Sequence, residues 1–248
     1  MRLTRIYVAQ PLTPGASIQL EASTSHYVRN VLRLKAGATI ALFNADDNHD
    51  YESLLSYQAK QAVASVQTRV LNTCESSLSS EIIQGLSRSD RMDWMLQKST
   101  ELGVSRISVF NSQHTQIPLK PAQLDKRLAH WRAIAVDACE QCGRHRPPEI
   151  SFHGTLGDVL LHSIQREAKI LLDMDGDKLI SLLPPETGCK QISLLVGSEG
   201  GLSDTEIEAA KQAGFISIGL GPRVLRTETA AISALAIAQS LWERGPYP

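Results

Sequence analysis

Two glycine-rich loops near the carboxyl end constrain the fold of this chain more than any other feature. The first loop, GSEGG at 197–201, follows the apolar run Ile192–Val196; the second, 221–229, follows Phe215–Leu220. Each apolar run predicts a buried strand, and glycine lets a ligand come close to the backbone. Open α/β sheets bind ligands beyond the carboxyl ends of their strands. We therefore expect these two strands to be neighbours and their loops to face one pocket.

Helical and strand patterns alternate from about residue 85 onward. Such alternation predicts a mostly parallel sheet covered by helices. The expected helices are 90–102, 121–142, a short one from Thr155, one after the capping box at 203–206, and 229–242; the further strands are 104–110, 149–152 and 169–173.

The front of the chain has a different pattern. Short alternating runs with frequent turn residues predict a small β-barrel of strands at 5–8, 17–20, 38–43, 51–57 and 62–70. A helical insert is expected at 26–33, with Val28, Val31 and Leu32 on its apolar face. The polar, serine-rich stretch that follows reads as a linker. We therefore divide the chain into a barrel (1–72), a linker (73–84) and an α/β domain (85–248).

Composition narrows the class of protein. Hydrophobic residues make up 42% of the 248 residues and charged residues 21%, and no apolar run approaches the roughly 20 residues that a membrane span needs. The amino end has no apolar core of a secretion signal. We expect a cytoplasmic protein without membrane contact.

Charge is unevenly distributed along the chain. Residues 1–35 and 85–146 carry an excess of Lys and Arg, whereas 147–248 carry an excess of Asp and Glu. A basic front is typical of a protein that contacts the phosphates of nucleic acid. Chance clustering on a solvated surface explains the counts equally well.

The pair Cys139 and Cys142, with His145 nearby, has the spacing of half a zinc site. A structural zinc site usually needs a second ligand pair, and Cys74 and Cys189 are isolated. We expect core packing and no metal.

Three nucleotide-binding or catalytic patterns do not match. The glycines of the first loop do not form G-x-G-x-x-G, the Walker lysine is absent, and Ser198 is not in a G-x-S-x-G elbow. The sequence therefore argues against dinucleotide binding, Walker-type NTP binding and serine hydrolysis.

Segments along the whole chain closely resemble one family. They are HYVRNVLRLKAG, DRMDWMLQKSTELGV, AVDACEQCGRHRPPEI, LLVGSEGGLSDTEIEAA and LGPRVLRTETAAISAL, and they are similar to the SPOUT methyltransferases, in particular to the RsmE family of small-subunit 16S ribosomal RNA uridine-N3 methyltransferases. The resemblance implies a carboxyl-terminal domain with a trefoil knot, a PUA-like barrel at the front and S-adenosylmethionine as cofactor. It also implies a homodimer through the carboxyl-terminal domain.

Position by position, the resemblance also implies site residues. The cofactor residues would be Leu172, Gly197, Glu199, Gly200, Gly201, Leu220, Gly221, Leu225 and Arg226. Two places depart from the family pattern: Ser198, where proline is usual, and the stretch 113–116, where an arginine is frequent.

Methylation of uridine N3 requires loss of a proton from a weakly acidic imide, which leaves negative charge on O2 and O4. An arginine can stabilise such an oxyanion and a carboxylate can accept the proton. Our hypothesis assigns these catalytic roles to Arg226 and Glu228, with Arg223 in reserve. The alternatives are that the two residues pair with each other, or that Glu228 only interacts with the positive amino end of the last helix and has no catalytic role.

Cationic residues that would contact RNA lie mostly toward the front. They are His26, Arg29 and Arg33, with Arg2, Arg5, Arg88, Lys98 and Arg223 as further candidates; each would otherwise be a solvated surface charge. The expected partner is small-subunit ribosomal RNA, naked or in an assembled subunit. Two other functions stay open: a knotted methyltransferase acting on a ribose hydroxyl or on transfer RNA, and a non-catalytic RNA-binding assembly factor.

Overall fold

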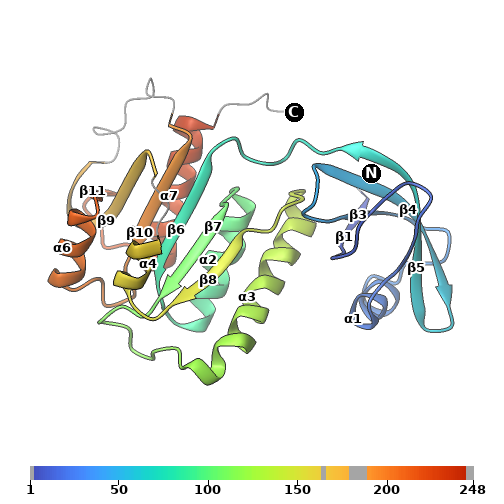
Figure 1. Ribbon diagram of the computed structural model, residues 1–248, viewed down its shortest axis with the longest axis horizontal. Coiled ribbons are helices and arrows are strands. Elements are labelled where there is room, and N and C mark those ends of the chain that lie inside the picture. Colours follow the sequence, from blue (N-terminus) through green and yellow to red (C-terminus); the bar gives the residue numbers. More distant parts are fainter. Residues whose placement is uncertain (1–2, 163–165, 179–188, 244–248) are drawn as a thin grey trace. The chain divides into compact units, whose positions relative to one another are not determined.

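The computed structural model describes residues 3–162, 166–178 and 189–243. The chain divides into two compact units, which are described separately (Figure 1). Unit 1 comprises Met1–Glu75 together with Cys139–Pro147, and unit 2 comprises Ser76–Ala138 and Pro148–Pro248.

Unit 1 is built on a five-stranded sheet in the order β1-β3-β4-β5-β2. Its strands are β1 Thr4–Tyr7, β2 Ser17–Gln19, β3 Thr39–Phe43, β4 His49–Gln58 and β5 Gln61–Leu71. The five predicted strands are therefore present. The pairing found among the described residues runs from β1 to β2 without joining these two outer strands, so the predicted closed barrel is replaced by an open sheet.

The predicted helical insert begins earlier than expected and changes its winding. Helix α1, Ala22–His26, continues into a π-helical turn η1, Tyr27–Val31, in which the N–H of Leu32 donates to the carbonyl of Tyr27, 3.0 Å away. Val28 is buried, as expected, but Val31 is 59% exposed. The i→i+5 bonding widens the turn, so the spacing assumed for an α-helix does not hold here.

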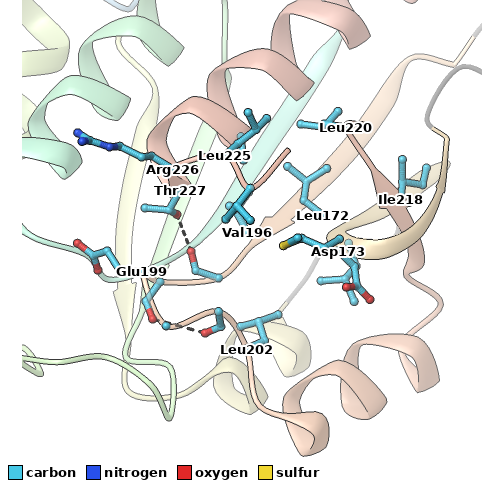
Figure 2. Close-up of a pocket in the computed structure, with 18 of the residues that line it drawn as sticks. Leu172, Asp173, Val196, Glu199, Leu202, Ile218, Leu220, Leu225, Arg226 and Thr227 are labelled. Atoms are coloured by element: carbon cyan, nitrogen blue, oxygen red, sulfur yellow. Dashed lines mark hydrogen bonds between the residues drawn. The ribbon is translucent and has the colours of Figure 1, made fainter. Parts of the chain in front are cut away.

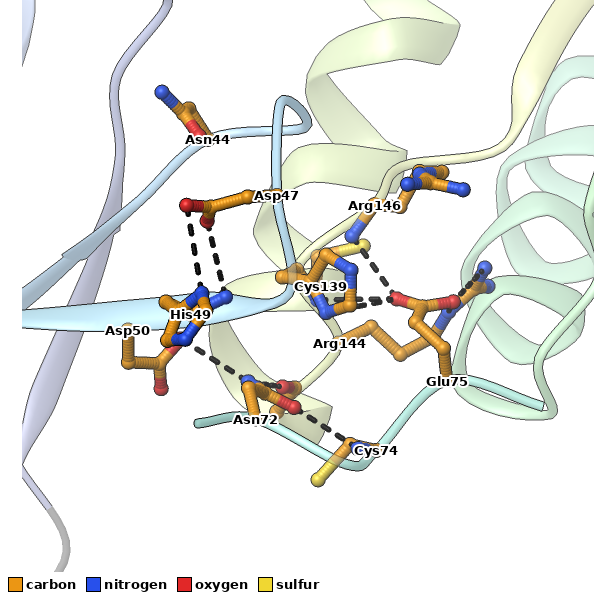
Figure 3. A network of polar contacts seen from close by, with 12 residues as sticks. Asn44, Asp47, His49, Asp50, Asn72, Cys74, Glu75, Cys139, Arg144 and Arg146 are labelled. Atoms are coloured by element: carbon orange, nitrogen blue, oxygen red, sulfur yellow. Dashed lines mark hydrogen bonds and ion pairs between the residues drawn. The ribbon is translucent and has the colours of Figure 1, made fainter. Parts of the chain in front are cut away.

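A cluster of charged side chains fastens the segment 139–147 within unit 1 (Figure 3). The guanidinium of Arg144 donates to the Glu75 carboxylate at 3.0 and 3.1 Å. Arg5 pairs with Asp50 at 2.8 Å and donates to the carbonyl of Cys139 at 2.6 Å. Both arginines are almost fully buried, so these partners supply hydrogen bonds that water would otherwise provide.

Unit 2 is built on a six-stranded sheet in the order β11-β9-β10-β6-β7-β8, in which every pairing is parallel (Figure 1). The strands are β6 Ser79–Gly85, β7 Arg106–Phe110, β8 Glu149–His153, β9 Ala168–Lys178, β10 Gln191–Val196 and β11 Ile216–Gly219. The predicted parallel α/β sheet is confirmed.

Strand β6 lies inside the segment 73–84 that was expected to be a linker. It pairs with β10 on one side and β7 on the other, so it is a central strand. This strand is hard to recognise in the sequence, because it begins with the polar residues Ser79 to Glu81 and its apolar part is short. The carboxylate of Glu81 is satisfied by the hydroxyls of Ser108 at 2.8 Å and Ser193 at 2.9 Å, which explains how an acidic residue is buried there.

Helices cover both faces of this sheet. They are α2 Ser89–Glu101, α3 Pro121–Cys142, α4 Leu156–His162, α6 Asp204–Gln212 and α7 Thr227–Trp242. Ile82 and Leu194 belong to the apolar cluster with α2, α3 and α7, whereas the next residues, Ile83 and Leu195, belong to the cluster with α4 and α6. Alternate strand residues point to opposite faces, so these are the two layers of the fold. Along the described ranges, no helix combines the length and apolar character of a membrane span.

The strand order corrects one expectation. Strands β10 and β11 are not neighbours, because β9 lies between them. The loops that follow β10 and β11 are therefore separated by a third strand.

Candidate functional site

A cavity of about 570 Å³ lies where β10 and β11 end, beside the middle of β9 (Figure 2). Its walls come from the middle of β9, the loop after β10, and the loop between β11 and α7. All the residues predicted for cofactor binding line it: Leu172, Gly197, Glu199, Gly200, Gly201, Leu220, Gly221, Leu225 and Arg226. The two loops thus meet in one cavity although their strands are not adjacent.

The first loop needs glycine for lack of space. A β-carbon on Gly197 would lie 2.7 Å from the backbone carbon of Gly201, and one on Gly200 would lie 2.7 Å from Cβ of His114. Gly201 has a φ of 75°, which L side chains rarely adopt. The loop is therefore folded back tightly on itself.

Glu199 links this loop to α2. Its Oε1 accepts from the backbone N–H of Arg88 at 2.9 Å and lies 3.3 Å from Nη1 of Arg91. A carboxylate at this position is stabilised by the positive amino end of the α2 dipole. Sequence analysis missed Arg91, which also lines the cavity; the only signal was its position at the start of a helix beside Arg88.

Arg226 and Glu228 have different environments. Arg226 immediately precedes α7, is exposed and lines the cavity. Glu228 lies in the first turn of α7, is 8% exposed, and is not among the lining residues. Its Oε2 has no hydrogen-bond partner in the described part of the chain, and no ion pair joins it to Arg226 there. The alternative that the two residues neutralise each other is therefore not seen.

The cavity has a charged end and an apolar end. In Figure 2, Arg226 and Glu199 lie at one end, and Leu172, Ile218 and Leu220 lie at the other. Asp173 lies near the apolar end. This separation lets the cavity hold an apolar ring system at one end and present charge to a second molecule at the other.

Two further residues missed by the sequence analysis connect the walls. The hydroxyl of Thr227 donates to the carbonyl of Gly197 at 2.6 Å. The amide of Gln84, at the end of β6, donates to both Thr227 Oγ1 and the Gly197 carbonyl. Gln84 was overlooked because its strand was taken for a linker.

The two departures from the family pattern meet in space. The Ser112 hydroxyl donates to Ser198 Oγ at 2.9 Å, and Nδ1–H of His114 donates to the carbonyl of Gly200 at 2.9 Å. The backbone N–H of Gln113 donates to the buried Glu206 at 3.0 Å. Hydrogen bonds from the segment 112–116 therefore restrain a loop in which proline is absent.

The predicted RNA-contacting residues of unit 1 fall into two groups. His26, Arg29 and Arg33 are exposed, with Arg29 donating to the carbonyl of Ala59 at 3.0 Å. Arg5 is buried, and its guanidinium is already used by Asp50 and by the carbonyl of Cys139. We therefore drop Arg5 as an RNA contact; Arg2 lies outside the described residues.

The remaining RNA candidates belong to unit 2. Arg223 lines the cavity. The exposed Arg88 donates to the side chain of Gln116 at 3.3 Å, and Lys98 pairs with Glu101 at 2.7 Å. Only Arg223 thus contributes to the cavity wall itself.

Burial raises the pKa of the Cys139 thiol to about 12. This thiol therefore stays protonated near neutral pH and is a poor nucleophile or metal ligand. Across the described ranges, no group of three or more His, Cys, Asp or Glu side chains is arranged to hold a metal ion.

The part of the chain that forms the parallel sheet and its glycine-walled cavity is an RNA methyltransferase domain, because the family of that description matches residues 74–239. The chain belongs to the RsmE family, the ribosomal RNA small subunit methyltransferases E. The protein of that name from Buchnera aphidicola (Schizaphis graminum) is 34% identical over 238 residues, which cover 96% of each chain.

Two solved structures share the whole fold. The ribosomal RNA small subunit methyltransferase E of Neisseria gonorrhoeae, bound to S-adenosylmethionine, is 32% identical with a TM-score of 0.87, covering 97% of this chain and 98% of its own. A methyltransferase of Legionella pneumophila in complex with the same cofactor is 33% identical with a TM-score of 0.90, with the same coverage.

Proposed function

We propose that this chain transfers a methyl group from S-adenosylmethionine to N3 of a uridine in 16S ribosomal RNA of the small subunit. The observation that carries the proposal is the cavity in which the glycine loop, the middle of β9 and the Arg226 loop meet. Family membership supports the RNA substrate, and the two cofactor-bound relatives support the methyl donor.

The cavity suits the proposed cofactor. Its volume of about 570 Å³ falls within the roughly 300–1,000 Å³ of small-molecule sites. Leu172, Ile218 and Leu220 offer an apolar slot for an adenine ring (Figure 2). The tight glycine loop lets backbone N–H and C=O groups reach the ligand's polar atoms. When bound, S-adenosylmethionine supplies a methyl group on a positively charged sulfur.

Chemistry at uridine N3 then needs alignment and charge stabilisation. A bond forms between N3 and the methyl carbon as the sulfur–carbon bond breaks, and the N3 proton leaves to a base. Arg226, at the charged end of the cavity, stabilises the negative charge on the uracil oxygens. Arg223, on the same loop, is the reserve candidate.

Glu228 is the proposed proton acceptor, or the residue that orients it. Its carboxylate is buried at the start of α7 with one oxygen unpartnered among the described residues. A carboxylate so placed has a free lone pair for a proton or for a bridging water. Its burial and its absence from the cavity lining favour action through a water over direct contact.

The wider organisation is also part of the proposal. We assign RNA binding to a PUA-like front through His26, Arg29 and Arg33, and catalysis to a knotted domain that corresponds to unit 2, includes β6 and forms a homodimer. The knot is supported by the return of three chain segments to one cavity, with β9 between β10 and β11. The partly exposed apolar residues of α7 support the dimer. The site of action would be the cytoplasm.

Methylation of unmodified small ribosomal subunits and of stripped 16S RNA, using labelled S-adenosylmethionine, tests the function. Digestion of the product to nucleosides should yield 3-methyluridine. A ribose-methylated nucleoside, or activity on transfer RNA alone, would identify a different methyltransferase. Cofactor binding without any transfer would favour a non-catalytic RNA-binding factor.

A further inference from the structure

We infer that Gln84 is a positioning residue of the cavity: it fixes the carbonyl of Gly197 to the first turn of α7, and so sets the cofactor loop against the loop that carries Arg226. The part of this inference that concerns methyl transfer rests on the proposed function. The part that concerns cofactor affinity does not depend on the RNA substrate.

The contacts converge on the amide nitrogen of Gln84. Nε2 of Gln84 lies 2.9 Å from the carbonyl of Gly85, 3.0 Å from that of Gly197 and 2.8 Å from Thr227 Oγ1. The Thr227 hydroxyl donates in turn to the Gly197 carbonyl at 2.6 Å. One carbonyl of the cofactor loop therefore receives two donors, one from β6 and one from α7.

Burial makes these contacts important. Gln84 is 1% exposed and Thr227 is 7% exposed, so water cannot replace a donor that is removed. Removing a hydrogen-bond donor from a buried carbonyl is therefore much more costly than removing one from an exposed carbonyl. The loop would move to recover a partner, and it forms the wall of the cavity.

The residue after Gln84 strengthens the argument. A β-carbon on Gly85 would lie 2.5 Å from the backbone nitrogen of Ser198 and 2.9 Å from the carbonyl carbon of Gly197. The cofactor loop thus crosses directly over the end of β6. Gly85 provides the space for the crossing, and Gln84 provides the hydrogen bonds that fix it.

Thr227 transmits this restraint to the reaction. It stands between Arg226 and Glu228 in the sequence, so anchoring its side chain fixes the backbone of both proposed catalytic residues. A displacement of about 1 Å at a reacting group can reduce a rate by about 100-fold.

The test compares Gln84→Met with a matched control, Gln239→Met. Gln239 is also a buried amide of unit 2, and lies in α7 far from the cavity along the helix; it donates to the carbonyl of Leu102 at 2.8 Å and accepts from Ser76 at 2.9 Å. Calorimetry with S-adenosylmethionine gives affinity, and thermal unfolding gives stability. We expect Gln84→Met to weaken cofactor binding at least tenfold and Gln239→Met to change it less than twofold, although both lower the melting temperature.

A second pair of variants keeps the test decisive if Gln84→Met does not fold. Thr227→Val removes the hydroxyl and Thr227→Ser retains it, so Ser should keep much more of the affinity than Val. The effects of Gln84→Met and Thr227→Val should not be additive in the double variant, because both residues act on one carbonyl. Additive losses, equal effects of Ser and Val, or equal cofactor affinities for Gln84→Met and Gln239→Met would overturn the inference.

Kinetics separate positioning from substrate binding. With unmodified small subunits at saturating cofactor, Gln84→Met should lower kcat at least tenfold and change the KM for RNA little. A change in KM alone would contradict positioning of Arg226. If the unaltered protein methylates no RNA, the proposed function fails, while the affinity comparison still decides the role of Gln84.

Discussion

The cofactor cavity of unit 2 and the charged cluster of unit 1 satisfy their polar groups in opposite ways. Around the cavity the critical contacts are made to main-chain carbonyls, and glycines 197 and 200 keep side chains out. In the cluster, Arg5 and Arg144 are buried and matched by Asp50 and Glu75. The cavity therefore depends on space left empty, whereas the cluster depends on charges being paired.

This difference predicts which substitutions each region tolerates. Adding one methyl group should damage the cavity and leave overall stability nearly intact. Removing one carboxylate should destabilise unit 1 and leave cofactor affinity unchanged. The predictions that follow test this contrast.

Replacing Arg226 with Ala should have the largest effect. Loss of a preorganised donor at a developing oxyanion lowers a rate by about 10²–10³-fold. We expect that loss in kcat for methyl transfer, with a much smaller change in cofactor affinity by calorimetry. Arg223→Ala is the matched control on the same loop and should lose far less; equal losses would remove the special role of Arg226.

Replacing Glu75 with Ala should destabilise the protein by about 3 kcal/mol, because it removes the carboxylate that pairs with the buried guanidinium of Arg144. Glu75 also accepts from the backbone N–H groups of His145 at 3.1 Å and Arg146 at 3.0 Å. Denaturant unfolding measures the loss. Glu149→Ala is the control: it pairs with Arg106 at 2.7 Å, but its side chain is 64% exposed, so less than about 1 kcal/mol is expected. A large loss of cofactor affinity in Glu75→Ala would contradict the expected difference between the cavity and the charged cluster.

Replacing Gly197 with Ala should weaken S-adenosylmethionine binding at least tenfold, since the new methyl group would lie 2.7 Å from the backbone of Gly201. Gly157→Ala is the matched control, because its nearest neighbour would be at an ordinary 3.6 Å. Calorimetry should show unchanged affinity for the control. Tight binding by Gly197→Ala would mean that the loop is not the cavity wall in solution.

A pH dependence of stability should be the smallest effect. Burial lowers the pKa of His145 below its usual 6.5, although the nearby Glu75 opposes the shift. Below about 6.5 the unfolded chain therefore binds a proton that the folded chain does not, and stability falls as the pH decreases. His145→Gln should flatten the dependence of the unfolding free energy on pH below about 6.5. An unchanged slope would show that His145 is not its source.

Local sequence signals predicted much of the fold. The capping box at Ser203 is formed as expected, with Glu206 accepting from the backbone N–H of Ser203 at 2.9 Å. Hydrophobic periodicity located the helices and most strands because it reports burial within a few residues. The same approach missed β6, whose polar start is satisfied by residues far away in the sequence, Ser108 and Ser193.

The candidate site was predicted in part for the same reason. Its glycine loops and Arg226 are recognisable because they are contiguous motifs. Gln84 and Arg91 could not be found in this way, since their relevance comes from contacts with residues more than 100 positions along the chain. Arg5 was assigned to RNA from charge alone, and its burial beside Asp50 depends on long-range packing.

By itself, the amino-acid sequence determined the parallel α/β class, the positions of the glycine turns and the family, because each depends on neighbouring residues. Only the tertiary structure decided that β9 separates β10 from β11 and that β6 supports the loop after β10. It also decided which charged side chains are buried. Those features depend on strand order and on packing between distant segments, which local propensity does not encode.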